Sequence, residues 1–132
     1  VTRRIRPSDN LLELLRMGRD PDMVFATRFD ALAGLVDLME TASRDLGRLR
    51  APTLLMYGGR DQVIEKGPMR LALRRAARPA GLRTAGYGEG FHLLNRDLGA
   101  ETVFADVEAF LRSPHAPLPS GAGPAEAVLG PG

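Results

Sequence analysis

The pattern of apolar and polar positions divides the chain into an N-terminal helical part and a C-terminal part that alternates strands with helices. A short helix is expected over residues 10–17, after a turn at 7–10. The longest helical signal covers about residues 28–48, where apolar side chains recur at steps of three and four. This stripe predicts a helix that packs one face against a core. Its members are Leu32, Leu35, Met39, Ala42, Leu46 and Leu49.

The pattern changes after Pro52. Residues 53–57 form a short apolar run without alternation, which ends in two glycines. Such a run is typical of a strand that is covered on both faces, as in a parallel sheet. A weaker strand is expected over 82–85, and a glycine-rich loop over 86–90 follows it.

Two further helices are expected, over 67–78 and over 99–111. The order strand, helix, strand, helix predicts two parallel strands joined by a crossover, and hence an α/β fold. Residues 113–132 consist mainly of proline, glycine, alanine and serine, a composition that predicts a disordered tail.

An aspartate and a histidine follow the two predicted strands. Asp61 lies in the loop after the first strand, and His92 in the loop after the second. Because the carboxyl ends of parallel strands open at one edge of a sheet, we expect these side chains to meet there. A neutral imidazole can take a proton from a hydroxyl, and a carboxylate can fix its tautomer. The pair therefore suggests the base and the acid of a catalytic triad, although each residue alone would be interpreted as a turn aspartate and a structural histidine.

No serine in the sequence has the surroundings of a triad nucleophile. The four serines are Ser8, Ser43, Ser113 and Ser120, and no G-x-S-x-G segment occurs. In α/β-hydrolases the triad runs serine, acid, histidine along the chain, and the serine lies on a turn between a strand and a helix. Asp61 and His92 fit the second and third places of this order, so a nucleophile is expected upstream of them.

Several segments resemble the monoacylglycerol lipase and lysophospholipase branch of the serine α/β-hydrolases, of the serine aminopeptidase S33 type. APTLLMYGGRDQVI, from Ala51 to Ile64, is similar to the strand and loop that carry the acid. YGEGFHLLNRDL, from Tyr87 to Leu98, is similar to the histidine loop. The motifs SDN at 8–10, GRDP at 18–21, TRFDA at 27–31 and GLVDLM at 34–39 resemble the cap region.

The resemblance implies that the chain holds part of a helical cap over 1–50 and the C-terminal segment of the hydrolase core over 51–112. It implies hydrolysis of a carboxylic ester, a monoacylglycerol or a lysophospholipid, with Asp61 as acid and His92 as base. It implies no metal or organic cofactor. The upstream half of the fold would be a partner, and peripheral contact with a membrane would accompany a lipid substrate. The cap of this family covers an acyl pocket, although for Met17, Met23, Phe25 and Phe29 a packing role is favoured over a lipid role.

Two other interpretations remain open at this stage. The chain could be a catalytically inactive remnant that acts by binding a partner, because it lacks a nucleophile. It could also serve another chemistry of the same scaffold, such as that of a peptidase or a haloperoxidase. An in-frame G-x-S-x-G upstream would distinguish an enzyme fragment from a remnant.

Composition and charge argue against two further classes of protein, nucleic-acid-binding proteins and membrane-spanning proteins. The formal net charge is +2, and among 18 basic residues Lys66 is the only lysine. No dense basic run is present, so a nucleic-acid partner is not expected. The chain has no cysteine and no apolar run long enough for a membrane span, and a cytoplasmic location is expected.

The remaining polar residues are expected to have structural or solvated roles. Asp97 is expected to cap the last helix, and His115 to be solvated in the tail. The pairs Asp20/Asp22 and Asp106/Glu108 are expected on solvated faces, and no cluster of residues has the spacing of metal ligands.

Overall fold

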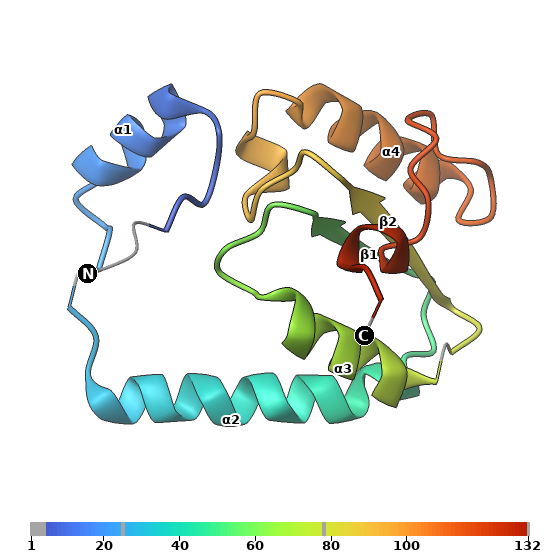
Figure 1. Ribbon diagram of the computed structural model, residues 1–132, viewed down its shortest axis with the longest axis horizontal. Coiled ribbons are helices and arrows are strands. Elements are labelled where there is room, and N and C mark those ends of the chain that lie inside the picture. Colours follow the sequence, from blue (N-terminus) through green and yellow to red (C-terminus); the bar gives the residue numbers. More distant parts are fainter. Residues whose placement is uncertain (1–4, 25, 78, 132) are drawn as a thin grey trace.

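A two-stranded parallel sheet lies at the centre of the molecule (Figure 1). The computed structural model describes residues 5–24, 26–77 and 79–131. Strand β1 (Thr53–Gly58) pairs in parallel with β2 (Leu82–Tyr87), in a register that places Thr53 opposite Leu82. Helix α3 (Lys66–Ala76) connects the strands, and the short helix η2 (Leu94–Arg96) and α4 (Ala100–Arg112) follow them. The predicted order and the parallel pairing are therefore confirmed.

Both faces of this sheet are covered, as the unalternated apolar run of β1 predicts. On one face, Leu55 and Tyr57 contact a cluster that includes Leu73 of α3. On the other face, Leu54 and Met56 pack against a cluster built around Phe110 of α4. Since successive side chains of a strand point to opposite faces, only a strand covered on both sides needs apolar residues at every position.

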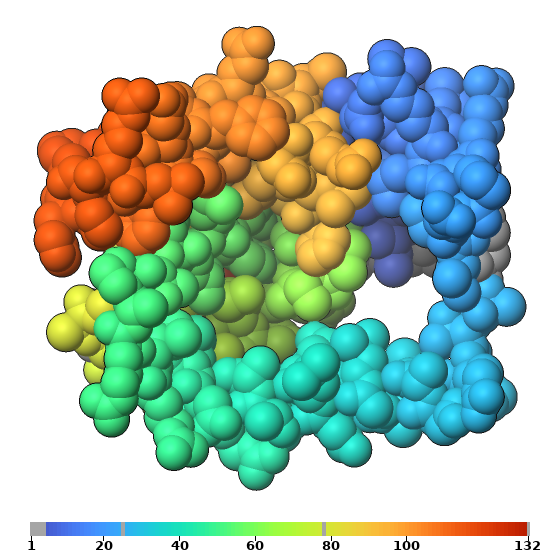
Figure 2. Space-filling view, turned by 180° about the vertical axis from the view of Figure 1, so that it is seen from behind, coloured from blue at the N-terminus to red at the C-terminus, as the bar shows by residue number. Residues whose placement is uncertain are grey.

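The N-terminal helices form an arm that contacts the core at only a few places. The arm consists of α1 (Leu11–Arg19), α2 (Phe29–Asp45) and the short helix η1 (Leu46–Arg48). Both helices were predicted, but the predicted packing of the stripe is wrong for its first part and is confirmed only at its end, where Leu46 packs against the cluster of Tyr57. Leu32, Leu35 and Met39 are 49%, 51% and 44% exposed, and neither α1 nor α2 has a buried residue. Figure 2 shows a gap between part of the arm and the core, with the arm adjoining the core on either side of it.

The C-terminal tail is ordered, and the prediction of disorder for 113–132 is wrong for the described residues. It ends in a short helix, α5 (Glu126–Leu129), and its apolar residues Leu118, Ala125 and Leu129 are buried on the sheet. The N–H of Gly86 donates to the carbonyl of Gly123 at 2.8 Å, so the tail covers the outer edge of β2. Unpaired strand edges attract other chains, and covering them avoids this.

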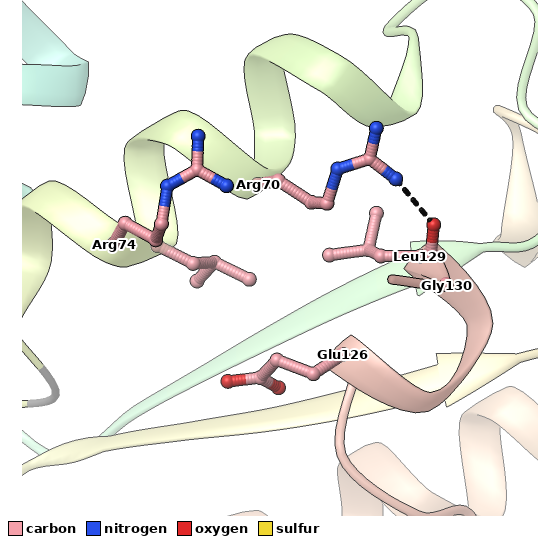
Figure 3. Close-up of a pocket in the computed structure, with 6 residues that line it drawn as sticks. Arg70, Arg74, Glu126, Leu129 and Gly130 are labelled. Carbon is pink, nitrogen blue, oxygen red and sulfur yellow. Dashed lines mark hydrogen bonds between the residues drawn. The ribbon is translucent and has the colours of Figure 1, made fainter. Parts of the chain in front are cut away.

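An arginine on α3 holds the end of this tail in place. The Arg70 guanidinium donates to the carbonyl of Leu129 at 2.7 Å (Figure 3). It also donates to the carbonyl of Pro131 at 3.3 Å. The last carbonyls of a helix have no partner inside the helix, and a cation at this end satisfies them. A small pocket of about 180 Å³ lies beside this contact. We interpret it as part of the joint between α3 and α5.

Candidate active site

Asp61 is held in a tight turn directly after β1. Its N–H donates to the carbonyl of Gly58 at 3.0 Å. Its Oδ1 accepts the N–H groups of Val63 at 2.7 Å and Ile64 at 3.0 Å, and only 6% of the side chain is exposed. These bonds are those of a turn aspartate, yet they use one carboxylate oxygen and leave Oδ2 for another partner.

That partner is His92. The loop after β2 places its Nδ1 at 3.0 Å from Oδ2 of Asp61, and 34% of the imidazole side chain is exposed. The structure therefore brings together the two residues that the sequence predicted would meet. With an ionised Asp61, Nδ1 of a neutral His92 carries the proton and donates it to the carboxylate. Nε2 then presents a lone pair, and none of the described residues is hydrogen-bonded to it.

Two glycines allow the acid loop and the histidine loop to come this close. The N–H of Gly59 donates to the carbonyl of Tyr87 at 2.7 Å, and the N–H of Arg60 to that of Gly90 at 2.9 Å. A Cβ at Gly59 would lie 2.6 Å from the carbonyl oxygen of Gly88, closer than real Cβ atoms come. The Gly58-Gly59 pair is therefore needed for the two loops to touch through their backbones.

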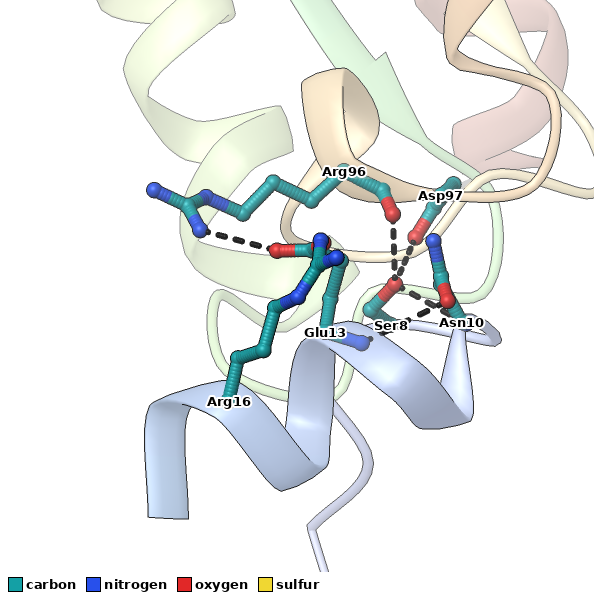
Figure 4. A network of polar contacts seen from close by, with 6 residues as sticks. All are labelled: Ser8, Asn10, Glu13, Arg16, Arg96 and Asp97. Carbon is teal, nitrogen blue, oxygen red and sulfur yellow. Dashed lines mark hydrogen bonds and ion pairs between the residues drawn. The ribbon is translucent and has the colours of Figure 1, made fainter. Parts of the chain in front are cut away.

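A buried carboxylate next to the histidine loop was misassigned from the sequence. Asp97 does not cap α4, whose N-cap is Gly99. Instead, Asp97 is 7% exposed, and its Oδ2 accepts the N–H of Phe91 at 2.7 Å. Its Oδ1 accepts the hydroxyl of Ser8 at 2.7 Å, and Ser8 is fully buried (Figure 4). The sequence contains both the motif at 8–10 and the histidine motif, to which Asp97 belongs. Only the contact between the two motifs shows that Asp97 links Ser8 to Phe91.

A second buried carboxylate lies below the glycine-rich loop. Asp106 was expected on a solvated face, but it is 0% exposed. It accepts the Tyr87 hydroxyl at 2.8 Å and the N–H of Ser120 at 2.9 Å, and the Ser120 hydroxyl also donates to it. Burial, together with the hydrogen bond to Asp106, raises the pKa of Tyr87 well above its usual range. The network fixes the end of β2, from which the histidine loop departs.

The other named residues take no part in this pair. His115 is exposed, and so are Asp20 and Asp22, as expected. None of the four serines is hydrogen-bonded to His92: Ser8 binds Asp97, Ser43 accepts from Arg75 at 3.4 Å, Ser113 ends α4, and Ser120 binds Asp106. Of the residues considered for a lipid role, Phe29 is 91% exposed, Met17 and Met23 are half-buried, and Phe25 lies outside the described residues.

An apolar groove of about 480 Å³ lies between α2 and α3 and reaches the acid loop. Its lining includes Leu55 and Met69, together with Ile64, whose N–H binds Asp61. In the described part of the chain no three His, Cys, Asp or Glu side chains are grouped as metal ligands would be. None of the described helices is long and apolar enough to cross a membrane.

Comparison with known families agrees with the geometry. The model of the serine aminopeptidase S33 family matches residues 3–99, a stretch that contains both Asp61 and His92. The chain therefore belongs to this family of α/β-hydrolases, and a hydrolase-type function follows. No curated protein and no solved structure matches the chain.

Proposed function

We propose that this chain supplies the acid and the base of a serine hydrolase that cleaves carboxylic esters, with a monoacylglycerol or a lysophospholipid as substrate. The observation that carries the proposal is the 3.0 Å hydrogen bond between Nδ1 of His92 and Oδ2 of Asp61, at the carboxyl edge of a parallel sheet. The serine is supplied by polypeptide that this sequence does not contain.

In this mechanism Nε2 of His92 accepts the proton of the serine hydroxyl while the serine oxygen attacks the ester carbonyl. Asp61 holds the ring in the required tautomer and stabilises the imidazolium that forms. The imidazolium then protonates the leaving alcohol. His92 next takes a proton from water, whose oxygen attacks the acyl-enzyme. The imidazolium then returns that proton to the serine oxygen as the acyl–serine bond breaks, and the carboxylic acid is released. No metal or organic cofactor takes part in these steps.

Two features support a partner that completes the site. Within the described residues, the sheet has only two strands, so the second edge of β1 has no neighbour. The apolar faces of α1 and α2 are exposed. In the proposed complete fold these faces would pack against the partner. The partner in this proposal provides a strand for β1, the serine and the donors of the oxyanion hole.

The preference for an ester with an acyl chain has a separate basis. The groove between α2 and α3 is lined mainly by apolar side chains and adjoins the acid loop at Ile64. An acyl chain fits such a lining, whereas the N-terminal amine of a peptide requires an acidic partner, and Glu40 in the lining is already paired with Arg75. The exposed apolar side chains of the arm would also allow peripheral contact with a lipid surface.

The test joins this chain to the N-terminal half of a family member that carries G-x-S-x-G. The assembled protein should hydrolyse a monoacylglycerol analogue, and His92→Ala should lower kcat by about a millionfold. His115→Ala changes the other histidine, whose side chain is exposed and away from the pair, and should leave kcat unchanged.

Three outcomes have a clear meaning. Equal kcat values for the two histidine variants would show that His92 is not the base. Faster cleavage of an aminoacyl anilide than of the ester would replace the esterase with a peptidase. Assembly without any hydrolysis would favour a binding module.

A further inference from the structure

A short N-terminal segment binds both loops of the candidate site, although it is far from them in sequence. The N–H of Arg6 donates to the side-chain oxygen of Gln62 in the acid loop at 3.0 Å. The carbonyl of Pro7 accepts the N–H of Leu93, the residue after His92, at 2.9 Å. The Arg6 guanidinium also lies 5.6 Å from the ring centre of Phe91, the residue before His92.

The most buried part of this contact is the bridge from Ser8 through Asp97 to Phe91. Ser8 is 0% and Asp97 is 7% exposed, and each bond of the carboxylate is 2.7 Å long. Hydrogen bonds to an ionised carboxylate are stronger than neutral ones, and burial excludes competing water. The backbone on both sides of His92 is therefore fixed, by Asp97 at Phe91 and by Pro7 at Leu93. Figure 4 shows the part of this bridge between Ser8 and Asp97.

We propose that Asp97, held by Ser8, is a positioning residue that orients His92 toward Asp61. This rests on the proposed function, in which the Nδ1–H tautomer of His92 is the reactive one. Among the described residues, the exposed imidazole makes one hydrogen bond, through Nδ1. Its orientation therefore depends on the backbone of residues 91–93, and that backbone is set by Asp97 and by Pro7. A shift of about 1 Å at a reacting group can lower a rate about a hundredfold.

The experiment measures the tautomer of His92 directly. The chain has two histidines, so long-range proton–nitrogen NMR spectra contain two ring systems, and the exposed His115 is an internal reference. In the unsubstituted chain we expect His92 to carry its proton on Nδ1. In Asp97→Ala we expect His92 to lose this preference and to show the tautomer mixture of His115.

Two variants serve as controls. Asp97→Asn keeps an oxygen that can accept the Phe91 N–H, so it should retain the Nδ1–H tautomer. Asp9→Ala removes a nearby carboxylate that accepts the N–H of Leu98 at 2.8 Å and does not touch residues 91–93. It should also leave the His92 tautomer unchanged.

The proposal has a readout even if Asp97→Ala does not fold. Ser8→Ala removes one of the two bonds and leaves Asp97 on Phe91, and it should weaken the Nδ1–H preference. An unchanged tautomer in folded Asp97→Ala, or in Ser8→Ala if Asp97→Ala unfolds, would overturn the positioning role. If His92 of the unsubstituted chain lacks the Nδ1–H preference, the acid–base pair itself fails, and with it the proposed function. In the assembled enzyme, Asp97→Ala should lower kcat about a hundredfold with little change in KM.

Discussion

Helix α2 and the C-terminal tail differ in burial in the opposite way from what their sequence patterns predict. Helix α2 has the most regular apolar stripe in the chain, yet Leu35 in that stripe is 51% exposed. The tail has no such pattern, yet Leu129 is 2% exposed. The difference shows that periodicity predicts which residues share a face but not whether anything covers that face. The tail lies on a sheet that must be covered, whereas the arm extends beyond it.

The largest expected effect comes from the same substitution made in both regions. Leu129→Ala removes a side chain from the cluster around Tyr57 and should lower the free energy of unfolding by about 3 kcal/mol. Leu35→Ala should change it by less than about 0.5 kcal/mol, because the site is exposed. Urea unfolding followed by circular dichroism measures both values. Similar losses at the two sites would mean that α2 is covered in solution, for instance by a second copy.

Two acidic residues on α4 repeat the comparison for polar groups. Asp106→Ala leaves the Tyr87 hydroxyl and two donors of Ser120 without their acceptor and should cost about 2–3 kcal/mol. Glu108→Ala removes an exposed ion pair with Arg112 and should cost at most about 0.5 kcal/mol. Thermal unfolding of the two variants side by side makes the measurement. An unaffected Asp106→Ala protein would show that the tail does not pack on α4.

Two glycines extend the comparison to the loops of the site. Gly59→Ala places a methyl group 2.6 Å from the backbone of Gly88 and should cost about 1–2 kcal/mol. It should also separate the loops and weaken the His92–Asp61 bond, which NMR of the imidazole would report. Gly88→Ala meets no atom within 4 Å and should be neutral in both measurements. A neutral Gly59→Ala would mean that the two loops are not held together through their backbones.

The smallest expected effect lies at alkaline pH. Burial raises the pKa of both tyrosines from 10.0, and for Tyr87 the hydrogen bond to Asp106 adds to it. A raised pKa in the folded state gives stability that is complete below the unfolded value and is lost as pH rises above it. The contribution of the two tyrosines to the free energy of unfolding should therefore be constant up to about pH 10 and should decrease above it.

Absorbance of tyrosinate tests this expectation. Neither tyrosine should ionise at its usual pH while the chain is folded. Tyr87→Phe should cost about 1 kcal/mol at neutral pH and make the alkaline loss less steep. Ionisation of Tyr87 near pH 10 in the folded protein, recognised as absorbance that Tyr87→Phe removes, would contradict the buried network of Asp106.

The sequence by itself determined the types and the order of α1 to α4 and of the two strands, the parallel pairing of β1 with β2, and the sheet edge shared by Asp61 and His92. These features depend on short-range patterns, such as a run of apolar residues or a pair of glycines after a strand. Each such pattern lies entirely within one segment of the sequence. Only the tertiary structure decided that the tail packs, that α2 is exposed, and that Asp97 and Asp106 are buried acceptors. Burial and hydrogen bonding at these positions depend in part on distant partners, such as Ser120 for Asp106, 14 residues away, and Ser8 for Asp97, 89 residues away. No local pattern identifies such a partner, because the residues next to an acidic side chain in sequence do not show whether it is buried or solvated.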